Sequence, residues 1–386
     1  MKCCYFDWAA TAPIHREVLS VMHETALKYP GNPSSGHQWG RAAAGRLQDI
    51  RSRCAELLGC RNSQLVFTSG GTESNSMVLS SLFWKKGRGS VVIPSIEHPS
   101  VSDFRNFLRE SGFQVVSIDA PWGFIDPKTF ASSLLPDTVM VCLSSVNNVC
   151  GSMQPLEDLI PIIRSHGERT GRRIHIHIDA VQALGKIPLD LSSLDIDSAS
   201  FSAHKISGPR GVGCLYFRRS FEPLSRGGSQ EFGIRPGTEN LAGAAGFLAA
   251  MELHVPDVSD RLERTRKLRN IVLDCIADDS PLELMQDVHR IDQYSPYILL
   301  LSANPVPSEV MLRVLSDKGF LLSAGSACSS KKSLRREGVL TSMGFSTKIA
   351  SGALRISFGP SAEEHEVRLL CDVLLKEAGT LRELLT

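Results

Sequence analysis

The chain has 386 residues, of which 42% are hydrophobic and 22% are charged, as in a globular protein with a sizeable core and two domains. Its 42 basic and 41 acidic side chains leave a net charge of +1. This balance creates no strong field toward nucleic acid or an anionic membrane surface, so we expect neither as a partner.

The sequence predicts a cytoplasmic protein. The longest charge-free apolar segment, 240–251, is shorter than the roughly 20 residues that span a bilayer. The N-terminus reaches Asp7 without an apolar signal region, so we expect no secretion or transit peptide. The ten cysteines form no CxxC pair and lie mostly in apolar segments, which fits a reducing compartment.

The first predicted elements are two helices. Apolar residues recur at helical spacing over 14–29 and over 41–59, and Gly59 ends the second helix.

Short apolar runs, separated by helical stretches, follow along the chain. They lie at 64–69, 90–95, 113–118, 138–145, 173–179, 197–202 and 211–218. Most are almost continuously apolar, which is typical of strands buried on both faces. The pattern predicts an α/β fold with a mainly parallel seven-stranded sheet flanked by helices.

After Glu239 the pattern changes to long helical regions with two further apolar runs, 295–302 and 352–359. This region predicts a smaller α+β domain. We expect a large domain over 15–256 and a small domain over 1–14 and 257–386.

Ligands gather at the carboxyl ends of the strands in such a sheet, so the residues that follow each strand are candidates. Gly70, Gly71 and Thr72 follow the run 64–69 and begin a helix, and backbone N–H groups there suit a phosphate. The segment also reads as an ordinary capped turn. It has neither the P-loop lysine nor GxGxxG, so a nucleotide motif is weakly supported.

Four later strands end in polar side chains that could do chemistry. His98 follows the second run, Asn147 and Asn148 the fourth, Asp179 ends the fifth, and His204 with Lys205 follows the sixth. Each alone reads as a surface residue or a helix cap. Chance strand ends would carry mostly Gly, Ser and Asp, so the set favours a binding site.

A metal site is a weaker alternative. His175, His177 and Asp179 face one side of a strand, but two of them fall inside a buried strand. No His/Glu pair follows at helical spacing. We therefore expect no metal, and interpret His177 as a core histidine.

Pyridoxal phosphate (PLP) explains the set better. PLP requires a lysine for its aldehyde and an acid beside its ring nitrogen, which Lys205 and Asp179 supply. The carboxylate keeps the ring nitrogen protonated because opposite charges favour the charged form.

The motifs resemble those of cysteine desulfurases of the NifS/IscS type, PLP-dependent transferases of fold type I in the class V aminotransferase group. The resemblance covers nearly the whole chain. The matching stretches include "YFDWAAT" (5–11), "FTSGGTESN" (67–75), "HIDAVQALGKIPLDL" (177–191), "SFSAHKISGPRGVGCLY" (200–216), "GGSQEFGIRPGTEN" (227–240) and "SAGSACSS" (323–330).

The resemblance implies a role for each matched position. Lys205 matches the Schiff-base lysine, Asp179 the partner of the ring nitrogen, and His98 the histidine that stacks on the ring and helps transfer protons. The remaining cofactor ligands are Gln182 at the ring hydroxyl oxygen, and Gly71, Thr72, Ser202, His204 and Thr238 at the phosphate. Thr238 serves the other subunit of a homodimer. Asn148 and Arg355 match the residues that bind the substrate carboxylate.

Cys328, in the "SAGSAC" form of the first subgroup, matches the nucleophile that takes up sulfur. One departure is Val149 where the family usually has Glu, followed by Cys150. We interpret Cys150 as a packing residue rather than a sulfur carrier.

The implied activity converts L-cysteine to L-alanine and leaves a persulfide on Cys328. A sulfur-acceptor protein, such as an iron–sulfur scaffold or a tRNA-thiolation enzyme, is the implied partner. The alternatives are a selenocysteine lyase, a related aminotransferase or desulfinase, and a non-catalytic sulfur-trafficking protein. A nicotinamide dehydrogenase is disfavoured because the dinucleotide fingerprint is missing.

Overall fold

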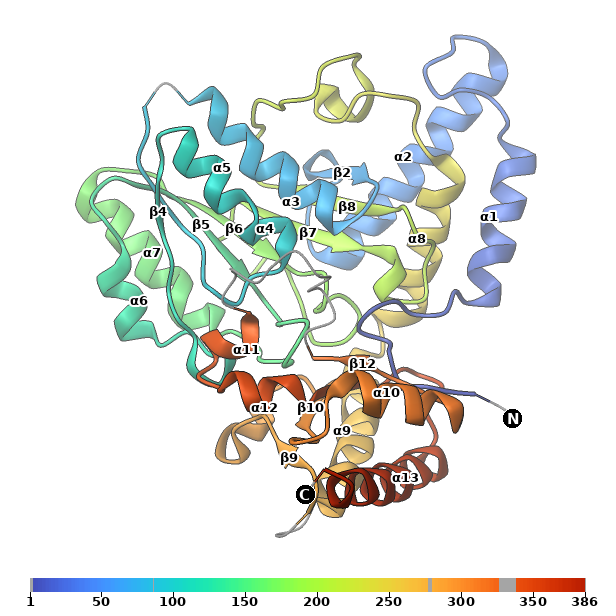
Figure 1. Cartoon of the computed structure of the whole chain (residues 1–386). Helices are drawn as coiled ribbons and strands as arrows, with labels where there is room; N and C mark the ends of the chain where they lie inside the picture. Colours follow the sequence, from blue (N-terminus) through green and yellow to red (C-terminus); the bar gives the residue numbers. More distant parts are fainter. Residues whose placement is uncertain (1–2, 86, 277–279, 326–337, 386) are drawn as a thin grey trace.

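The computed structural model describes residues 3–85, 87–276, 280–325 and 338–385, and its main feature is a seven-stranded sheet (Figure 1). In spatial order the strands are β2 (Leu65–Thr68), β8 (Gly213–Phe217), β7 (Ser198–Ser202), β6 (His175–Asp179), β5 (Thr138–Ser144), β3 (Ser90–Val92) and β4 (Gln114–Val116). Neighbouring strands from β7 to β4 pair in parallel, whereas β8 runs antiparallel to both β7 and β2. The predicted mainly parallel seven-stranded sheet is therefore confirmed.

Helices cover both faces of this sheet (Figure 1). They are α1 (Arg16–Lys28), α2 (Gln38–Leu58), α3 (Gly71–Ser80), α4 (Pro99–Ser102), α5 (Phe104–Glu110), α6 (Pro127–Ser133), α7 (Leu156–Thr170) and α8 (Leu241–His254). The two helices predicted over 14–29 and 41–59 correspond to α1 and α2. Gly59 ends α2 in the left-handed conformation, φ 68°, which glycine adopts without steric cost.

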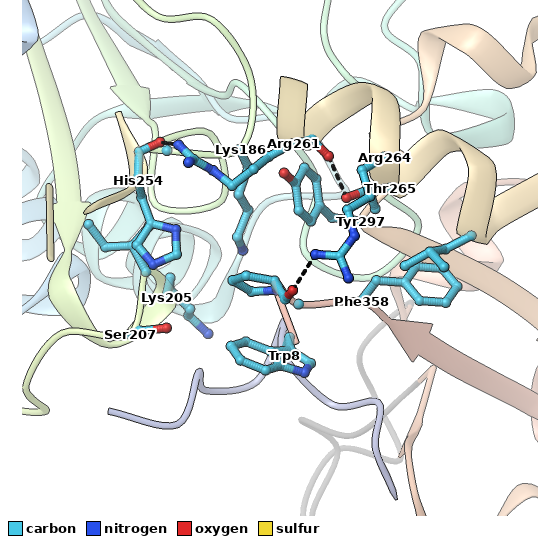
Figure 2. Close-up of a pocket in the computed structure, with 15 residues that line it drawn as sticks. Trp8, Lys186, Lys205, Ser207, His254, Arg261, Arg264, Thr265, Tyr297 and Phe358 are labelled. Atoms are coloured by element: carbon cyan, nitrogen blue, oxygen red, sulfur yellow. Dashed lines mark hydrogen bonds between the residues drawn. The ribbon is translucent and has the colours of Figure 1, made fainter. Parts of the chain in front are cut away.

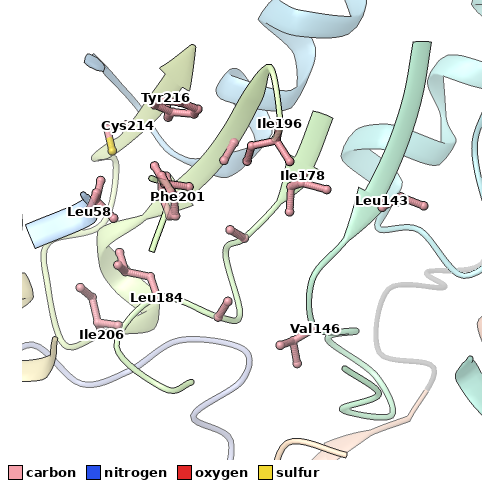
Figure 3. Packing of buried hydrophobic residues seen from close by; sticks show 14 of the residues in the cluster. Leu58, Leu143, Val146, Ile178, Leu184, Ile196, Phe201, Ile206, Cys214 and Tyr216 are labelled. Atoms are coloured by element: carbon pink, nitrogen blue, oxygen red, sulfur yellow. The ribbon is translucent and has the colours of Figure 1, made fainter. Parts of the chain in front are cut away.

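Alternate residues of the central strands supply two separate hydrophobic cores. In β5, Val141 and Leu143 pack toward α2, α6, α7 and α8, whereas Met140 and Cys142 pack toward α3 and α5. Figure 3 shows part of the larger cluster, in which Phe201 of β7 lies among side chains from neighbouring strands and turns. Burial on both faces explains why these strands are almost continuously apolar.

A second, smaller sheet lies below the first in Figure 1 and has its own hydrophobic cluster. Its strands are β12 (Ser323–Ala324), β13 (Ala353–Ser357), β10 (Ile298–Ser302) and β9 (Glu283–Leu284), in that order. The helices in this part are α9 (Val258–Cys275), α10 (Ser308–Asp317), α11 (Val339–Ser342), α12 (Thr347–Ser351) and α13 (Glu364–Glu383). This arrangement is compatible with the α+β unit expected here, and the proposed domain boundaries stay a prediction.

The N-terminal segment connects the two sheets. Its strand β1 (Cys4–Tyr5) pairs in parallel with β11 (Phe320–Leu321). Asp7 then bridges to Ser357 of β13, whose hydroxyl accepts a hydrogen bond from the Ala9 N–H at 2.9 Å. The segment thereby brings backbone carbonyls of residues 9 and 10 to the large sheet, where polar side chains follow the strands.

We expect Phe201→Ala to lower the free energy of unfolding by about 3–5 kcal/mol, because it opens a cavity in the larger core around a fully buried ring. Urea titration followed by circular dichroism measures the change. Leu27→Ala, at a position 69% exposed, is the control and should change stability little. Equal effects of the two substitutions would contradict this account of the core.

Candidate active site

Asp179 lies at the carboxyl end of β6, and two N–H groups hold its carboxylate. Its Oδ2 accepts a hydrogen bond from Asn75 Nδ2 at 2.8 Å, and its Oδ1 accepts one from the Val181 N–H at 3.1 Å. Asp179 is only 8% exposed. A buried carboxylate requires such donors, and here they fix its direction as well.

Asn75, on α3, connects Asp179 to two further side chains. Its Nδ2 also donates to Ser100 Oγ at 2.8 Å, and its Oδ1 lies 2.9 Å from His177 Nε2. His177 Nδ1 in turn lies 2.8 Å from Ser198 Oγ. His177 is therefore a core histidine with a definite task, because its ring fixes which way the Asn75 amide points.

His98 begins α4, and its ring is oriented by Ser100. The Ser100 N–H donates to His98 Nδ1 at 3.1 Å, and Ser100 Oγ lies 2.8 Å from the same nitrogen. Nδ1 is thus an acceptor, which places the ring proton on Nε2. Burial lowers the pKa of His98, the Asp179 carboxylate opposes that change, and the Lys205 ammonium adds to it. The ring is therefore neutral near pH 7.

Lys205 lies at the end of a short 3-10 helix, η4 (Ala203–Lys205), directly after β7. Its Nζ donates to the backbone carbonyls of Ala9 and Ala10, both at 2.7 Å. Gln182 Nε2 donates to the same Ala9 carbonyl at 2.9 Å. Lys205 and Gln182 thus converge on one oxygen of the N-terminal segment.

Four predicted phosphate ligands line one pocket of about 330 Å³ beside these residues. They are Gly71, Thr72, Ser202 and His204. The rest of the wall is formed by Thr11, Ser69, Gly70, Glu73, Arg210 and Gly211. A Cβ on Gly71 would lie 2.4 Å from Val181 Cγ2, so only glycine lets the start of α3 approach the turn after Asp179. The start of α3 and two hydroxyl side chains offer donors to an anion at this place.

Arg355 and Asn148, predicted to bind a substrate carboxylate, touch one another. Arg355 is buried on β13, and one of its terminal nitrogens donates to the Asn148 carbonyl at 2.8 Å. The other terminal nitrogen pairs with Asp7 at 2.9 Å. Its Nε is buried and has no hydrogen-bond partner within the described part of the chain, so it remains available as a donor.

Thr238 differs from the other predicted phosphate ligands because it is not part of the wall of this pocket, and its side chain is exposed. Its loop is nevertheless anchored. Glu231 accepts hydrogen bonds from both terminal nitrogens of Arg51, at 2.6 and 2.8 Å, and one from the Phe67 N–H at 2.8 Å. The predicted nucleophile, Cys328, lies outside the described residues.

Comparisons with known proteins agree with this geometry. The aminotransferase class-V family model matches residues 4–370. The chain belongs to the aminotransferase class-V family. It is 34% identical to the cysteine desulfurase IscS of Dictyoglomus turgidum, over 98% of this chain and 95% of the relative. The IscS of Klebsiella pneumoniae subsp. pneumoniae is also 34% identical, over 98% and 94%.

A solved NifS-like protein has the same fold, with a TM-score of 0.88 and 31% identity, covering 99% of this chain and 100% of the other. The protein is therefore an enzyme of the class-V family in its cysteine desulfurase group, and PLP is its cofactor. The residues present fit that cofactor. They offer donors for its phosphate, a buried carboxylate for its ring nitrogen and an amine for its aldehyde.

Cys150, the unusual thiol for this class-V enzyme, is a packing residue in the structure. Its Sγ is fully buried, 3.4 Å from Asn147 Oδ1 and 3.3 Å from Ser152 Oγ. Burial raises the pKa of the Cys150 thiol, so the nucleophilic thiolate is disfavoured. Val149 also packs in the larger core.

Sequence reasoning missed several residues that shape the site, among them Asn75, Ser100 and Glu97. Asn75 lies within the matched stretch 67–75, which was a signal that could have identified it. Glu97 precedes His98 and is fully buried, with its Oε1 accepting the Ser144 N–H at 2.9 Å. Its Oε2 has no hydrogen-bond partner among the described residues. Burial, reinforced by the Asp179 charge, raises the pKa of Glu97 from 4.5 to about 8.

Glu97→Gln should make the ligand-free protein less sensitive to alkaline pH. Between the unfolded pKa of 4.5 and the folded pKa of about 8, the unfolded chain releases a proton that the folded chain keeps. Stability therefore falls as the pH rises through this window. Glutamine stays neutral at every pH, so the stability of the variant should lack the decrease that Glu97 causes between about pH 5 and about pH 8.

Urea unfolding at about pH 5 and about pH 8 measures the difference between wild type and variant. Asp126→Asn is the matched control, since that carboxyl is exposed and its pKa is lowered by the Thr129 N–H. Parallel pH dependences for wild type and Glu97→Gln would contradict a protonated Glu97.

Proposed function

We propose that this protein converts L-cysteine to L-alanine with bound PLP, and that Cys328 takes up the sulfur as a persulfide. The observation that supports this most is the convergence of Lys205, Asp179 and His98 beside an anion pocket, in a chain of the cysteine desulfurase group. The reaction balances: the Cβ–Sγ bond of cysteine breaks, an S–S bond forms, and the Cys328 thiol proton goes to the alanine.

The cofactor-binding residues fall into five groups by the part of PLP that they would contact. Gly71, Thr72, Ser202 and His204 would hold the phosphate, Asp179 the ring nitrogen, Gln182 the ring hydroxyl oxygen, His98 the ring face and Lys205 the aldehyde carbon. When bound, PLP supplies a protonated ring that stabilises negative charge at the substrate α-carbon.

The chain's own groups would move the protons. Once displaced by substrate, the Lys205 amine can accept the α-proton, and the Ala9 and Ala10 carbonyls hold it in place. His98 is neutral with its proton on Nε2, so it is suited to donate a hydrogen bond or a proton from the ring face.

Arg355 would fix the substrate by its carboxylate. Its buried Nε provides a free donor, and its Asp7 partner keeps the guanidinium in one orientation before substrate arrives. Arginine suits this task because its donors lie in a rigid plane. Asn148, whose backbone carbonyl contacts Arg355, would add its side-chain amide.

The finer assignments complete the proposal. Thr238 would reach the phosphate of the other subunit of a homodimer, which its exposure outside its own pocket supports.

The enzyme would be cytoplasmic and would pass its sulfur to an iron–sulfur scaffold or a tRNA-thiolation enzyme. Within the described residues, no helix has the length and apolar character needed to cross a membrane. The division into a large domain over 15–256 and a small domain over 1–14 and 257–386 is part of the same proposal.

Cys328→Ser should abolish persulfide formation and leave cofactor binding intact. The variant keeps every group that would contact PLP, so its visible band should still change on adding L-cysteine. Persulfide is measured by thiol alkylation and mass spectrometry. Cys3→Ser, which removes an exposed thiol elsewhere in the chain, is the control and should form persulfide normally. Sulfide release at the wild-type rate by Cys328→Ser would rule out this nucleophile.

Lys205→Ala should remove the covalent attachment of PLP, because the substitution deletes the Nζ that Ala9 and Ala10 hold in place. The protein is first reduced with borohydride, which makes the attachment permanent. It is then unfolded, washed in denaturant and analysed by mass spectrometry for a retained cofactor. Lys28→Ala, at an exposed position of α1, is the control and should retain the label. A labelled Lys205→Ala chain would assign the attachment to another lysine.

A further inference from the structure

A second lysine, Lys186, is buried behind the candidate site. It lies in the turn after β6 and is only 7% exposed. Its Nζ donates to Gln182 Oε1 at 2.6 Å, and this oxygen is its acceptor within the described chain. Lysine is rarely buried without a carboxylate partner, so the position calls for a physical reason.

Hydrogen bonds connect Lys186 to Lys205 through two intermediates. Lys186 donates to Gln182, the Gln182 amide donates to the Ala9 carbonyl at 2.9 Å, and Lys205 donates to that carbonyl at 2.7 Å. The two amines therefore hold opposite ends of one short chain of polar groups.

The cavity next to Lys186 lacks negative charge. Figure 2 shows Lys186 and Lys205 on its wall together with His254, Arg261 and Arg264. Among the described residues that form this wall, none carries a carboxylate.

Burial lowers the pKa of Lys186 to about 7, and the charges of Lys205 and Arg355 act in the same direction. His254 adds no cation near pH 7, since burial and then Arg261 lower its pKa to about 4. An uncharged or weakly charged amine can remain buried here because it needs no counter-ion. It still offers N–H donors.

Lys186 decides which way the Gln182 amide faces. If the amide turned over, its oxygen would face the Ala9 carbonyl, which is a repulsive contact, and its NH₂ would face an amine that accepts a hydrogen bond only in its uncharged form, so the observed orientation is preferred. In the observed orientation one Gln182 N–H is used by Ala9. The second N–H has no acceptor among the described residues and remains for a ligand.

We propose that Lys186 is a positioning residue that holds the Gln182 amide with its N–H toward the ring hydroxyl oxygen of PLP. The inference rests on the proposed function, because Gln182 meets that oxygen only if PLP binds at Lys205. Lys186 itself would not touch the cofactor. It acts on the cofactor through Gln182.

The test is a pH titration of the visible band of the PLP-loaded protein. In Lys186→Met the amide loses its anchor, and the ring oxygen loses a donor. That oxygen then holds the proton shared with the Lys205 nitrogen more strongly. The apparent pKa of the band should rise by roughly 0.5 to 1 unit, the equivalent of one hydrogen bond. An unchanged pKa would overturn the inference. Lys186→Leu removes the same donor and replaces Lys186→Met in the test if that variant does not fold.

A double-mutant cycle separates positioning from a direct charge effect. In a Gln182→Leu background, the Lys186→Met change should shift the pKa no further, because the amide that transmits the effect is gone. A shift of the same size in that background would show that Lys186 acts by its charge, and would overturn the positioning role. Tyr297→Phe is the matched control, since it removes a hydroxyl from the same cavity without contacting Gln182.

The outcomes distinguish this inference from the proposed function. A wild-type protein without a PLP band, or a Lys205→Ala variant that keeps the covalent cofactor, would overturn both. A wild-type band that depends on Lys205 but is indifferent to Lys186 would overturn the positioning role alone.

Discussion

A charge buried at the end of a central strand constrains this structure more than any other feature. Asp179 is carried into the interior by a parallel strand, and its carboxylate stays stable there because Asn75 and the Val181 N–H donate to it. Asn75 must then be held, and Ser100 and His177 hold it. Ser100 also orients His98, so the acid and the ring proposed to stack on the cofactor are set by one network. A change in any member would reach both groups.

The N-terminal segment provides a second constraint. Its strand β1 pairs with β11, its residues Asp7 and Ala9 contact Ser357 of the smaller sheet, and it presents the Ala9 and Ala10 carbonyls to Lys205. Asp7 of the same segment pairs with Arg355. The position of the amine and the position of the guanidinium therefore depend on one stretch of chain. Bringing the two sheets together is part of forming the site rather than a separate step.

The sequence predicted the large sheet well, because strands buried on both faces are almost continuously apolar and are therefore easy to recognise. The polar side chains expected at the strand ends lie close together in the structure, since parallel strands deliver their carboxyl ends to one edge. Asn75 lies within the matched stretch 67–75, but its contact with Asp179 could not be predicted from spacing, since Asp179 is 104 residues away. Arg355 was matched by the resemblance, but its ion pair with Asp7 was not predicted, because the two residues are 348 residues apart. The protonation of Glu97 and the lowered pKa of Lys186 depend on burial, and burial is set by packing that no single stretch contains.

The anchor of the loop that bears Thr238 has a consequence for assembly. Glu231 holds this loop by a buried ion pair with Arg51 and by a hydrogen bond from the Phe67 N–H. The backbone at Glu231 and Phe232 adopts positive φ angles of 46° and 60°. The loop is thus shaped by its own subunit. In the proposed homodimer, an arm with a fixed shape has little conformational entropy left to lose when a second subunit docks. Folding of each chain would therefore prepare the other chain's phosphate site before the two subunits meet.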